Sequence, residues 1–208
     1  MIPVQLKELL LQSLEHEKGG VLIYRTALEC VTRTELQQEW EKYLAQTENH
    51  VVILTSVCKA LNLDPTERTP GCTVVQHVGK SLVQAMKMAL AAGNLVAAEL
   101  VACECIMLAE TKDHANWELI GACAETYDER TGLTLRDAYG EIEDEEDEHL
   151  YRTKGWCREL WLSSLGIKAT LPPPEEKRDV KTAVEAAKAK ESEEPREREP
   201  NRKARTTN

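Results

Sequence analysis

Residues 133–165, LTLRDAYGEIEDEEDEHLYRTKGWCRELWLSSL, decide the fold, because one stripe of residues recurs through them at alternating spacings of four and three. This spacing is typical of a helix that buries one face in a bundle. Two members of the stripe are ionisable: Glu146 and His149 lie one turn apart in its middle, within the tetrapeptide EDEH. The full stripe reads Leu135, Tyr139, Ile142, Glu146, His149, Thr153, Trp156 and Leu160.

A carboxylate in an inward-facing position needs a compensating partner, because burying its charge alone costs several kcal/mol. A bound metal ion is the sharpest candidate for that partner. The idea requires further ligands from the other helices of the bundle.

The whole chain has the composition of an all-α protein. Its 208 residues include only 10 glycines and no phenylalanine, and apolar residues make up 42%. Helix-forming Ala, Leu, Glu and Lys are abundant. The length suits one sizeable domain, which we place at residues 1–168. Residues 169–208 open with three prolines at 172–174, are dense in mixed charge, and are predicted to be a disordered tail.

Periodicity and breakers predict an antiparallel four-helix bundle with an extra short helix in the crossover. Two short connections, near residues 32–34 and 130–133, imply two antiparallel helical hairpins. Thr34 and Gln37 are expected to form a capping box at the start of the second helix. The predicted helices cover about residues 4–31, 34–61, 73–91, 95–130 and 133–165.

Ionisable residues interrupt the inward stripes of the other three long helices as well. Glu17 interrupts the first stripe, His50 the second, and Glu110 and Asp113 the one over residues 95–130. Glu17 and His50 are 33 residues apart, and the same separation joins Asp113 to Glu146. Equal separations across two hairpins of similar length place these groups at matching heights, so we expect them to converge on one polar centre.

Such a centre is what a dinuclear carboxylate site requires, since oxygen ligands with one or two imidazoles suit iron or manganese. A single inward histidine is more often a hydrogen-bonded core residue, and a metal-free polar network is the alternative for the cluster as a whole. The acidic run 141–148 is most simply a solvated helix face, or else a negative field that concentrates cations near the site. The candidate metal ligands are Glu17, His50, Glu110, Asp113, Glu146 and His149.

The pattern resembles the ferritin-like superfamily of di-iron carboxylate bundles. Its marks are Glu17 followed seven residues later by Tyr24, and the E-x-x-H of Glu146 and His149. The stretches 16–51 and 113–118 are more closely similar to the YciF-like stress-response ferritin-like family. This resemblance covers residues 1–165 and implies one or two iron or manganese ions, oxygen or peroxide chemistry as an oxidoreductase, and a role in oxidative or general stress response.

One turn departs from the superfamily pattern. The second helix normally supplies its own E-x-x-H, but here that turn begins at Thr47 and ends at His50, so it offers no inward carboxylate. Asp113 also replaces the usual glutamate. One of the two metal positions is therefore expected to be weaker, and the site is potentially degenerate. A non-catalytic, metal-free bundle that acts through protein association is the alternative function.

The net charge and the cysteine content limit the partners and the compartment that we expect. A net charge of −10 argues against a nucleic-acid partner, because no basic face is available for phosphates. The seven scattered cysteines form no C-x-x-C pair, which indicates reduced thiols in the cytoplasm. No apolar stretch is long enough for a membrane span. A homodimer is expected from an apolar stripe on the crossover helix, formed by Val75, Val78, Leu82 and Met86.

Overall fold

The computed structural model describes residues 2–127 and 129–193, and the predicted all-α class is confirmed. No strand occurs within these two ranges. The helices are α1 (Val4–Ala27), α2 (Thr34–Ala60), α3 (Pro70–Ala91), α4 (Leu95–Thr126), α5 (Glu129–Ser164) and α6 (Ala183–Glu193).

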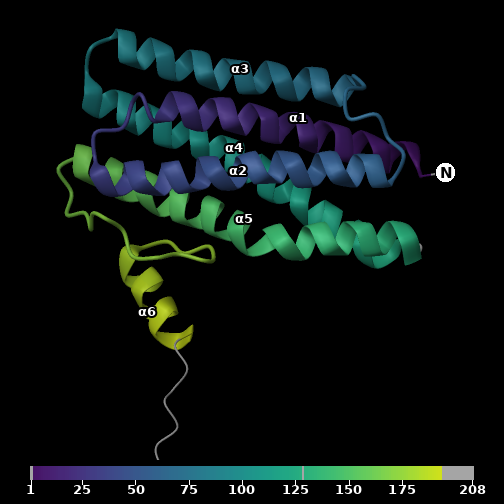
Figure 1. Cartoon of the computed structure of the whole chain (residues 1–208). Helices are drawn as coiled ribbons and strands as arrows, with labels where there is room; N and C mark the ends of the chain where they lie inside the picture. Colours follow the sequence, from purple (N-terminus) through teal and green to yellow (C-terminus); the bar gives the residue numbers. More distant parts are fainter. Residues whose placement is uncertain (1, 128, 194–208) are drawn as a thin grey trace, which may run out of the picture.

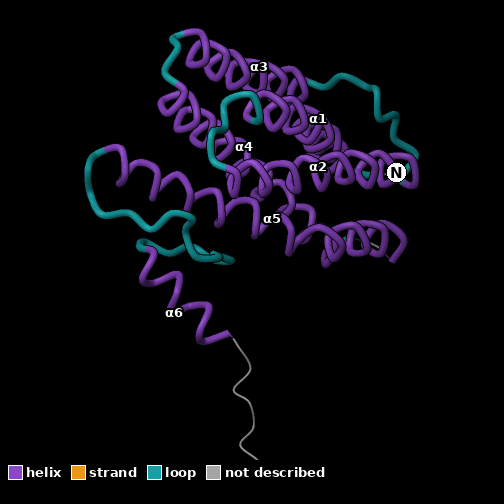
Figure 2. The backbone as a smooth tube through the Cα atoms, turned by 60° about the vertical axis from the view of Figure 1, so that its left-hand side comes forward, coloured by secondary structure: helices purple, strands orange, loops and turns teal. Residues whose placement is uncertain are grey.

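Five long helices lie side by side, and α6 points away from them beyond α5 (Figure 1). α1 packs against α2 and α4, and α5 packs against the same two helices, so these four close a ring of antiparallel neighbours. α3 packs outside the ring on α1 and α4. Figure 2 shows the same order from another side, with α3 and α5 at opposite edges.

The prediction that α3, the crossover helix, exposes an apolar stripe is wrong in part. The helix is longer than predicted, with 22 residues, and it docks along α1. Met86 is fully buried and Leu82 packs against the same core, because α1 and α4 cover this face. Val78 remains 49% exposed. Homodimer formation stays a prediction.

The start of α3 and the cap of α2 differ from prediction. α3 begins earlier than predicted because the Thr69 hydroxyl accepts a hydrogen bond from the Cys72 amide at 3.2 Å and Pro70 starts the helix. The capping box at Thr34 and Gln37 is absent: Thr34 lies inside α2, and Arg33 precedes it without a side-chain cap.

Glu99 of α4 takes over the role of that cap. Its fully buried carboxylate accepts hydrogen bonds from the Thr32 amide at 2.8 Å, the Thr32 hydroxyl at 2.9 Å and the Arg33 amide at 3.0 Å. Its second oxygen contacts the Arg33 guanidinium. One buried acid therefore fixes the α1–α2 turn to α4.

Removing this acid should destabilise the protein strongly. Glu99→Ala is expected to lower the free energy of unfolding by about 3 kcal/mol, because the Thr32 and Arg33 amides and the Arg33 charge lose their acceptor. Urea unfolding measures the effect. Glu125→Ala, on the exposed face of the same helix, is the control and should stay within about 0.5 kcal/mol of the wild type. Equal losses in the two variants would contradict the capping role.

Two apolar clusters fill the ring, one toward each end, with a polar layer between them. One cluster contains Tyr24, Trp40 and Trp156, and the other contains Leu54 and Trp117. In every ring helix the ionisable residues come between members of the two clusters. Along the chain, Glu17 lies between Leu14 and Tyr24, His50 between Tyr43 and Leu54, Glu110 between Ile106 and Trp117, and Glu146 and His149 between Ile142 and Trp156.

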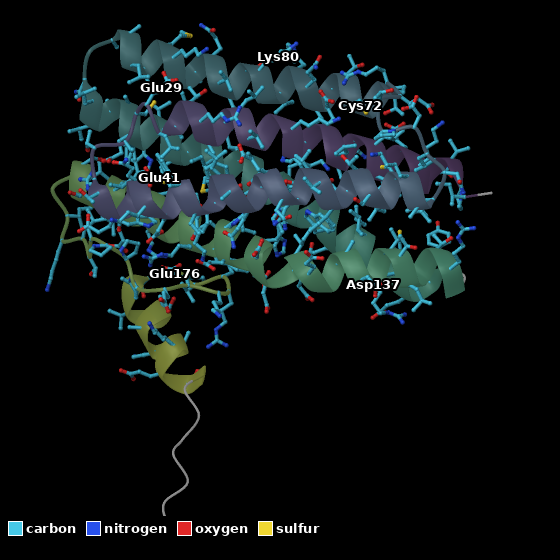
Figure 3. All side chains as sticks on the ribbon, in the orientation of Figure 1. Glu29, Glu41, Cys72, Lys80, Asp137 and Glu176 are labelled. Carbon is cyan, nitrogen blue, oxygen red and sulfur yellow. The ribbon has the colours of Figure 1, made fainter. Side chains whose placement is uncertain are left out.

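The prediction of a disordered tail is wrong for residues 171–193. Gly166, at φ 70°, turns the chain after α5, and the following segment folds back along α5 before α6 begins. Glu176, labelled in Figure 3, is buried beside Arg158. A Cβ on Gly155 would lie 2.7 Å from a Glu176 oxygen, so this glycine permits the close approach.

Specific partners explain why the mixed-charge composition misled the prediction. Lys154 pairs with Asp179, and Arg152 donates to the carbonyl of buried Pro173. Several charged groups of the segment and of α5 therefore have specific partners across the contact between them. Residues 194–208, also predicted to be disordered, lie outside the described residues. None of the described helices combines the length and apolar composition that a membrane span requires.

Candidate metal centre

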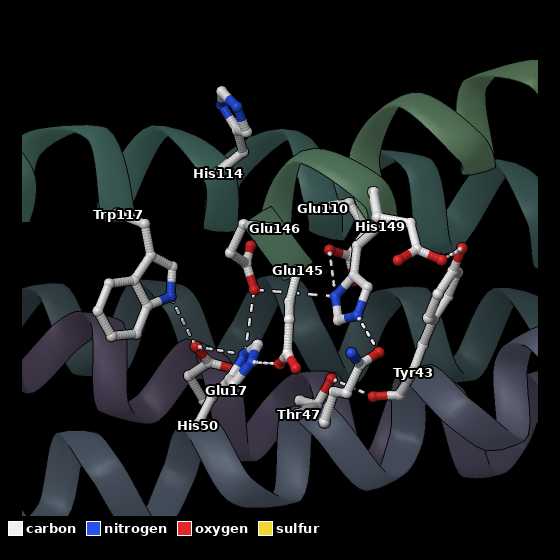
Figure 4. Close-up of polar contacts among 12 residues, drawn as sticks. Glu17, Tyr43, Thr47, His50, Glu110, His114, Trp117, Glu145, Glu146 and His149 are labelled. Atoms are coloured by element: carbon white, nitrogen blue, oxygen red, sulfur yellow. Dashed lines mark hydrogen bonds and ion pairs between the residues drawn. The ribbon is translucent and has the colours of Figure 1, made fainter. Parts of the chain in front are cut away.

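Five buried ionisable side chains from all four ring helices meet in the polar layer (Figure 4). None is more than 4% exposed, and the two apolar clusters shield them from both ends of the bundle. α5 supplies two of them, one turn apart. They are Glu17 on α1, His50 on α2, Glu110 on α4, and Glu146 and His149 on α5.

The first group of potential ligands contains Glu17, His50 and Glu146. One ligand atom from each lies within 4.8 Å of the others. The His50 Nδ1 atom is 3.6 Å from Glu17 Oε1 and 3.1 Å from Glu146 Oε1. Atoms this close surround a space suited to a single cation.

The second group contains Glu110, Glu146 and His149, again within 4.8 Å. The His149 Nδ1 atom is 3.6 Å from Glu110 Oε2 and 3.8 Å from Glu146 Oε1. Glu146 belongs to both groups, and its Oε1 atom faces both imidazoles. This is the position of a bridging carboxylate.

Outer acceptors hold both imidazoles with Nδ1 turned inward. His50 Nε2 lies 2.8 Å from Glu145 Oε2, and His149 Nε2 lies 3.0 Å from Gln46 Oε1. A hydrogen-bond acceptor at Nε2 keeps a proton on that nitrogen. In the neutral imidazole this leaves the Nδ1 lone pair free for a metal, which is the usual arrangement around metal-binding histidines. The rings stack with their centroids 5.8 Å apart.

The sequence-based prediction missed Glu145 and Gln46. Glu145 is one of seven acids in the run 141–148, and nothing in the run marks it as different from its solvated neighbours. Gln46 lies one turn before His50 on α2, but it contacts His149 on another helix. The only signal in the sequence for these two residues was that each lies one helical turn before a predicted ligand.

Two hydrogen bonds fix the terminal carboxylates. The Trp117 indole donates to Glu17 Oε1 at 2.9 Å, and the Tyr24 hydroxyl donates to Glu110 Oε1 at 2.8 Å. In both cases the second oxygen, Oε2, is left without a hydrogen bond. Tyr24, predicted to lie near the site, therefore contacts one of its acids.

Unsatisfied polar atoms concentrate in this cluster. Among the described residues, nine buried side-chain atoms lack a hydrogen bond, and six of them belong to the predicted ligands. Leaving a buried polar atom unsatisfied typically costs about 1–3 kcal/mol. Oxygen and imidazole donors grouped in this way could hold a metal ion. The six atoms are Glu17 Oε2, His50 Nδ1, Glu110 Oε2, Asp113 Oδ1, Glu146 Oε2 and His149 Nδ1.

No protein family, curated protein or solved structure matches this chain.

Asp113 is the predicted ligand that lies outside both groups. It is buried on α4, one turn from Glu110. Burial, together with the negative charges of Glu17 and Glu146, raises the pKa of its carboxyl well above the usual range. Of the two acids on α4, Glu110 is the one close to His149. Asp113 adds a further buried acid beside the cluster.

Thr47 occupies the place of the missing carboxylate on α2. Its side chain is buried, and its hydroxyl donates to the Tyr43 carbonyl at 2.9 Å. The second helix therefore offers the cluster one imidazole and no acid.

The cluster retains protons when no cation is present. Burial lowers the pKa of His50, but its contacts with Glu146 and Glu17 outweigh burial and raise the pKa to about 11. Burial likewise opposes protonation of His149, yet Glu110 and Glu146 raise its pKa overall. Burial and the nearby Glu110 and Glu17 carboxylates raise the pKa of Glu146 to about 7, against the effect of His50. The protonated His50 imidazole thus occupies a place that a cation would take.

Proposed function

We propose that this chain is a ferritin-like metal protein that binds two iron or manganese ions between Glu17, His50, Glu110, Glu146 and His149. Glu146 would be shared by the two positions, and His50 and His149 would each help to hold one ion. The observation that carries the proposal is the shared carboxylate: two ligand groups, each complete with an imidazole and a second acid, meet at the Glu146 Oε1 atom.

Charge compensation favours two ions over one. Glu17, Glu110, Asp113 and Glu146 together carry −4 when ionised, and two divalent cations carry +4. A buried cluster is most stable when its charges cancel. Asp113 would supply the fourth negative charge without being a direct ligand, which gives this buried acid a role.

Bound iron or manganese would supply electrons for oxygen or peroxide chemistry, in line with a role in oxidative or general stress response. The chain's own contribution is positioning and the exclusion of water. Tyr24 orients Glu110, and Trp117 orients Glu17. The Tyr43 ring covers His149, with the ring centroids 4.3 Å apart. The acids and imidazoles are therefore held in place by contacts in a buried part of the bundle.

Elemental analysis of protein purified without chelator tests this proposal. We expect iron or manganese at about one to two equivalents per chain, lost on Glu17→Ala combined with Glu146→Ala. Removing the metal with a chelator should also lower the thermal midpoint, because an ion that binds only the folded state stabilises it.

The alternative is a metal-free bundle that acts by association. It draws support from the ion pairs that the protonated imidazoles make with Glu17, Glu110 and Glu146. Metal-free protein that gains no stability from added Fe²⁺ or Mn²⁺, and folds normally after the two substitutions, would favour this alternative. A homodimer and a cytoplasmic location are proposed with the metal function and need their own measurements.

A further inference from the structure

A polar cleft of about 260 Å³ opens between α4 and α5 beside the proposed metal centre. Its walls include the exposed acids Glu118 and Glu143, the half-exposed Asp147 and the imidazole of His114. The cleft is separate from the contacts that orient the metal-binding imidazoles, which are made by Glu145 and Gln46.

The deep side of the cleft reaches the proposed bridging carboxylate. Two of its lining residues, Trp117 and Glu146, are only 1% and 2% exposed. The Glu146 Oε2 atom is buried and has no hydrogen bond. An unsatisfied carboxylate oxygen on the lining of a polar cleft is an acceptor for a ligand that arrives through it.

The charge of the cleft selects for cations. Glu118, Glu143 and Asp147 give it three carboxylates in addition to Glu146, and none of the described residues that line it is Lys or Arg. The Tyr139 hydroxyl donates to Glu143 at 2.7 Å, and His114 Nε2 lies 2.8 Å from Asp147. Both acids are therefore held at the cleft instead of moving freely in solvent.

The size of the cleft matches a hydrated ion. Six water molecules take up roughly 180 Å³ at about 30 Å³ each, which fits within the volume found here. Divalent cations keep much of their water when they first meet carboxylates at a protein surface. A preliminary site can thus bind the ion in its hydrated form, before water is removed at the buried ligands.

We propose that this cleft is the entrance of the metal centre, where Glu118, Glu143 and Asp147 bind a hydrated divalent cation and pass it to Glu146. The inference rests on the proposed function and adds a route to it. The acids of the run 141–148 then differ in role: Glu143 and Asp147 line the route, whereas Glu141 and Asp144 are exposed elsewhere on α5.

Stopped-flow uptake of Co²⁺ by the metal-free full-length protein tests the route, with the visible absorption of bound Co²⁺ as the signal. The double variant Glu143→Gln/Asp147→Asn should take up Co²⁺ about tenfold more slowly than the wild type at low salt. Its final amount of bound Co²⁺ should be unchanged, because neither residue belongs to the two ligand groups.

The matched control is Glu141→Gln/Asp144→Asn, which removes the same charge from the same run at exposed positions outside the cleft. This control should keep the wild-type rate to within about twofold. Equal slowing in both variants would show a general effect of net charge and overturn the route. Wild-type rates in the cleft variant would overturn it as well. Wild-type protein that takes up no Co²⁺ would overturn the proposed function itself, and the entrance with it.

Discussion

Glu146→Gln should remove both bound cations, the largest loss expected from any single substitution in this chain. Glu146 contributes a ligand atom to both groups, whereas Glu17 and Glu110 each belong to one. A neutral amide cannot bridge two cations, and its loss of charge leaves the buried ions uncompensated. Elemental analysis after Mn²⁺ loading should find about two equivalents in the wild type and almost none in this variant.

Single-group variants provide the comparison. Glu17→Gln and Glu110→Gln should each lose about one equivalent of Mn²⁺ and keep the other. Asp144→Asn, an exposed change on the same helix as Glu146, should bind as the wild type does. If Glu146→Gln retained as much Mn²⁺ as Glu17→Gln, Glu146 would not be the bridge.

Metal binding should release protons, and its affinity should rise steeply with pH. The pKa of His50 is raised to about 11, so its imidazole holds an extra proton near pH 7 when no cation is bound, and the pKa of His149 is raised in the same direction. A cation at Nδ1 has to displace that proton. At least the His50 proton should therefore leave on full loading, and the apparent affinity should increase about tenfold per pH unit for every proton released.

The direction of this pH dependence follows from which form of the protein, metal-free or metal-loaded, binds more protons. The metal-free folded protein holds protons that the metal-loaded protein lacks, so acid favours the metal-free form and alkali the loaded one. Calorimetric titration with Mn²⁺ in two buffers of different ionisation enthalpy gives the number of protons directly. Binding without proton release, or with an affinity independent of pH between about 6 and 8, would contradict the inward Nδ1 assignment.

The sequence predicted the ring helices and the meeting of their ionisable residues because both follow from one periodicity. Residues that share the inward stripe of a packed helix must share its core, so periodicity alone was enough to place Glu17 and His50 together. Matching heights followed from the separation of 33 residues across the first hairpin.

Periodicity could not decide which of two inward-facing acids on one helix is the ligand. Glu110 and Asp113 are one turn apart on α4 and both face inward. The spacing of 33 favoured Asp113 as the partner of Glu146, and the two acids are close enough for the charge of Glu146 to raise the pKa of Asp113. The longer Glu110 side chain reaches His149, and Asp113 stays outside both groups.

Long-range polar contacts could not be predicted from local patterns. Glu99 caps a turn that lies more than 60 residues away in the sequence, and Glu145 reaches His50 on another helix. The charged segment that follows α5 is held by ion pairs such as Arg158 with Glu176. Composition records that charges are present but does not record their partners.

Anomalous diffraction from a crystal of the protein loaded with Mn²⁺ tests the central claim most directly. We predict two peaks about 3.5–4 Å apart on either side of Glu146, one next to His50 Nδ1 and the other next to His149 Nδ1. An ordered cluster without Mn²⁺, with His50 and His149 still paired directly to the carboxylates, would contradict this claim.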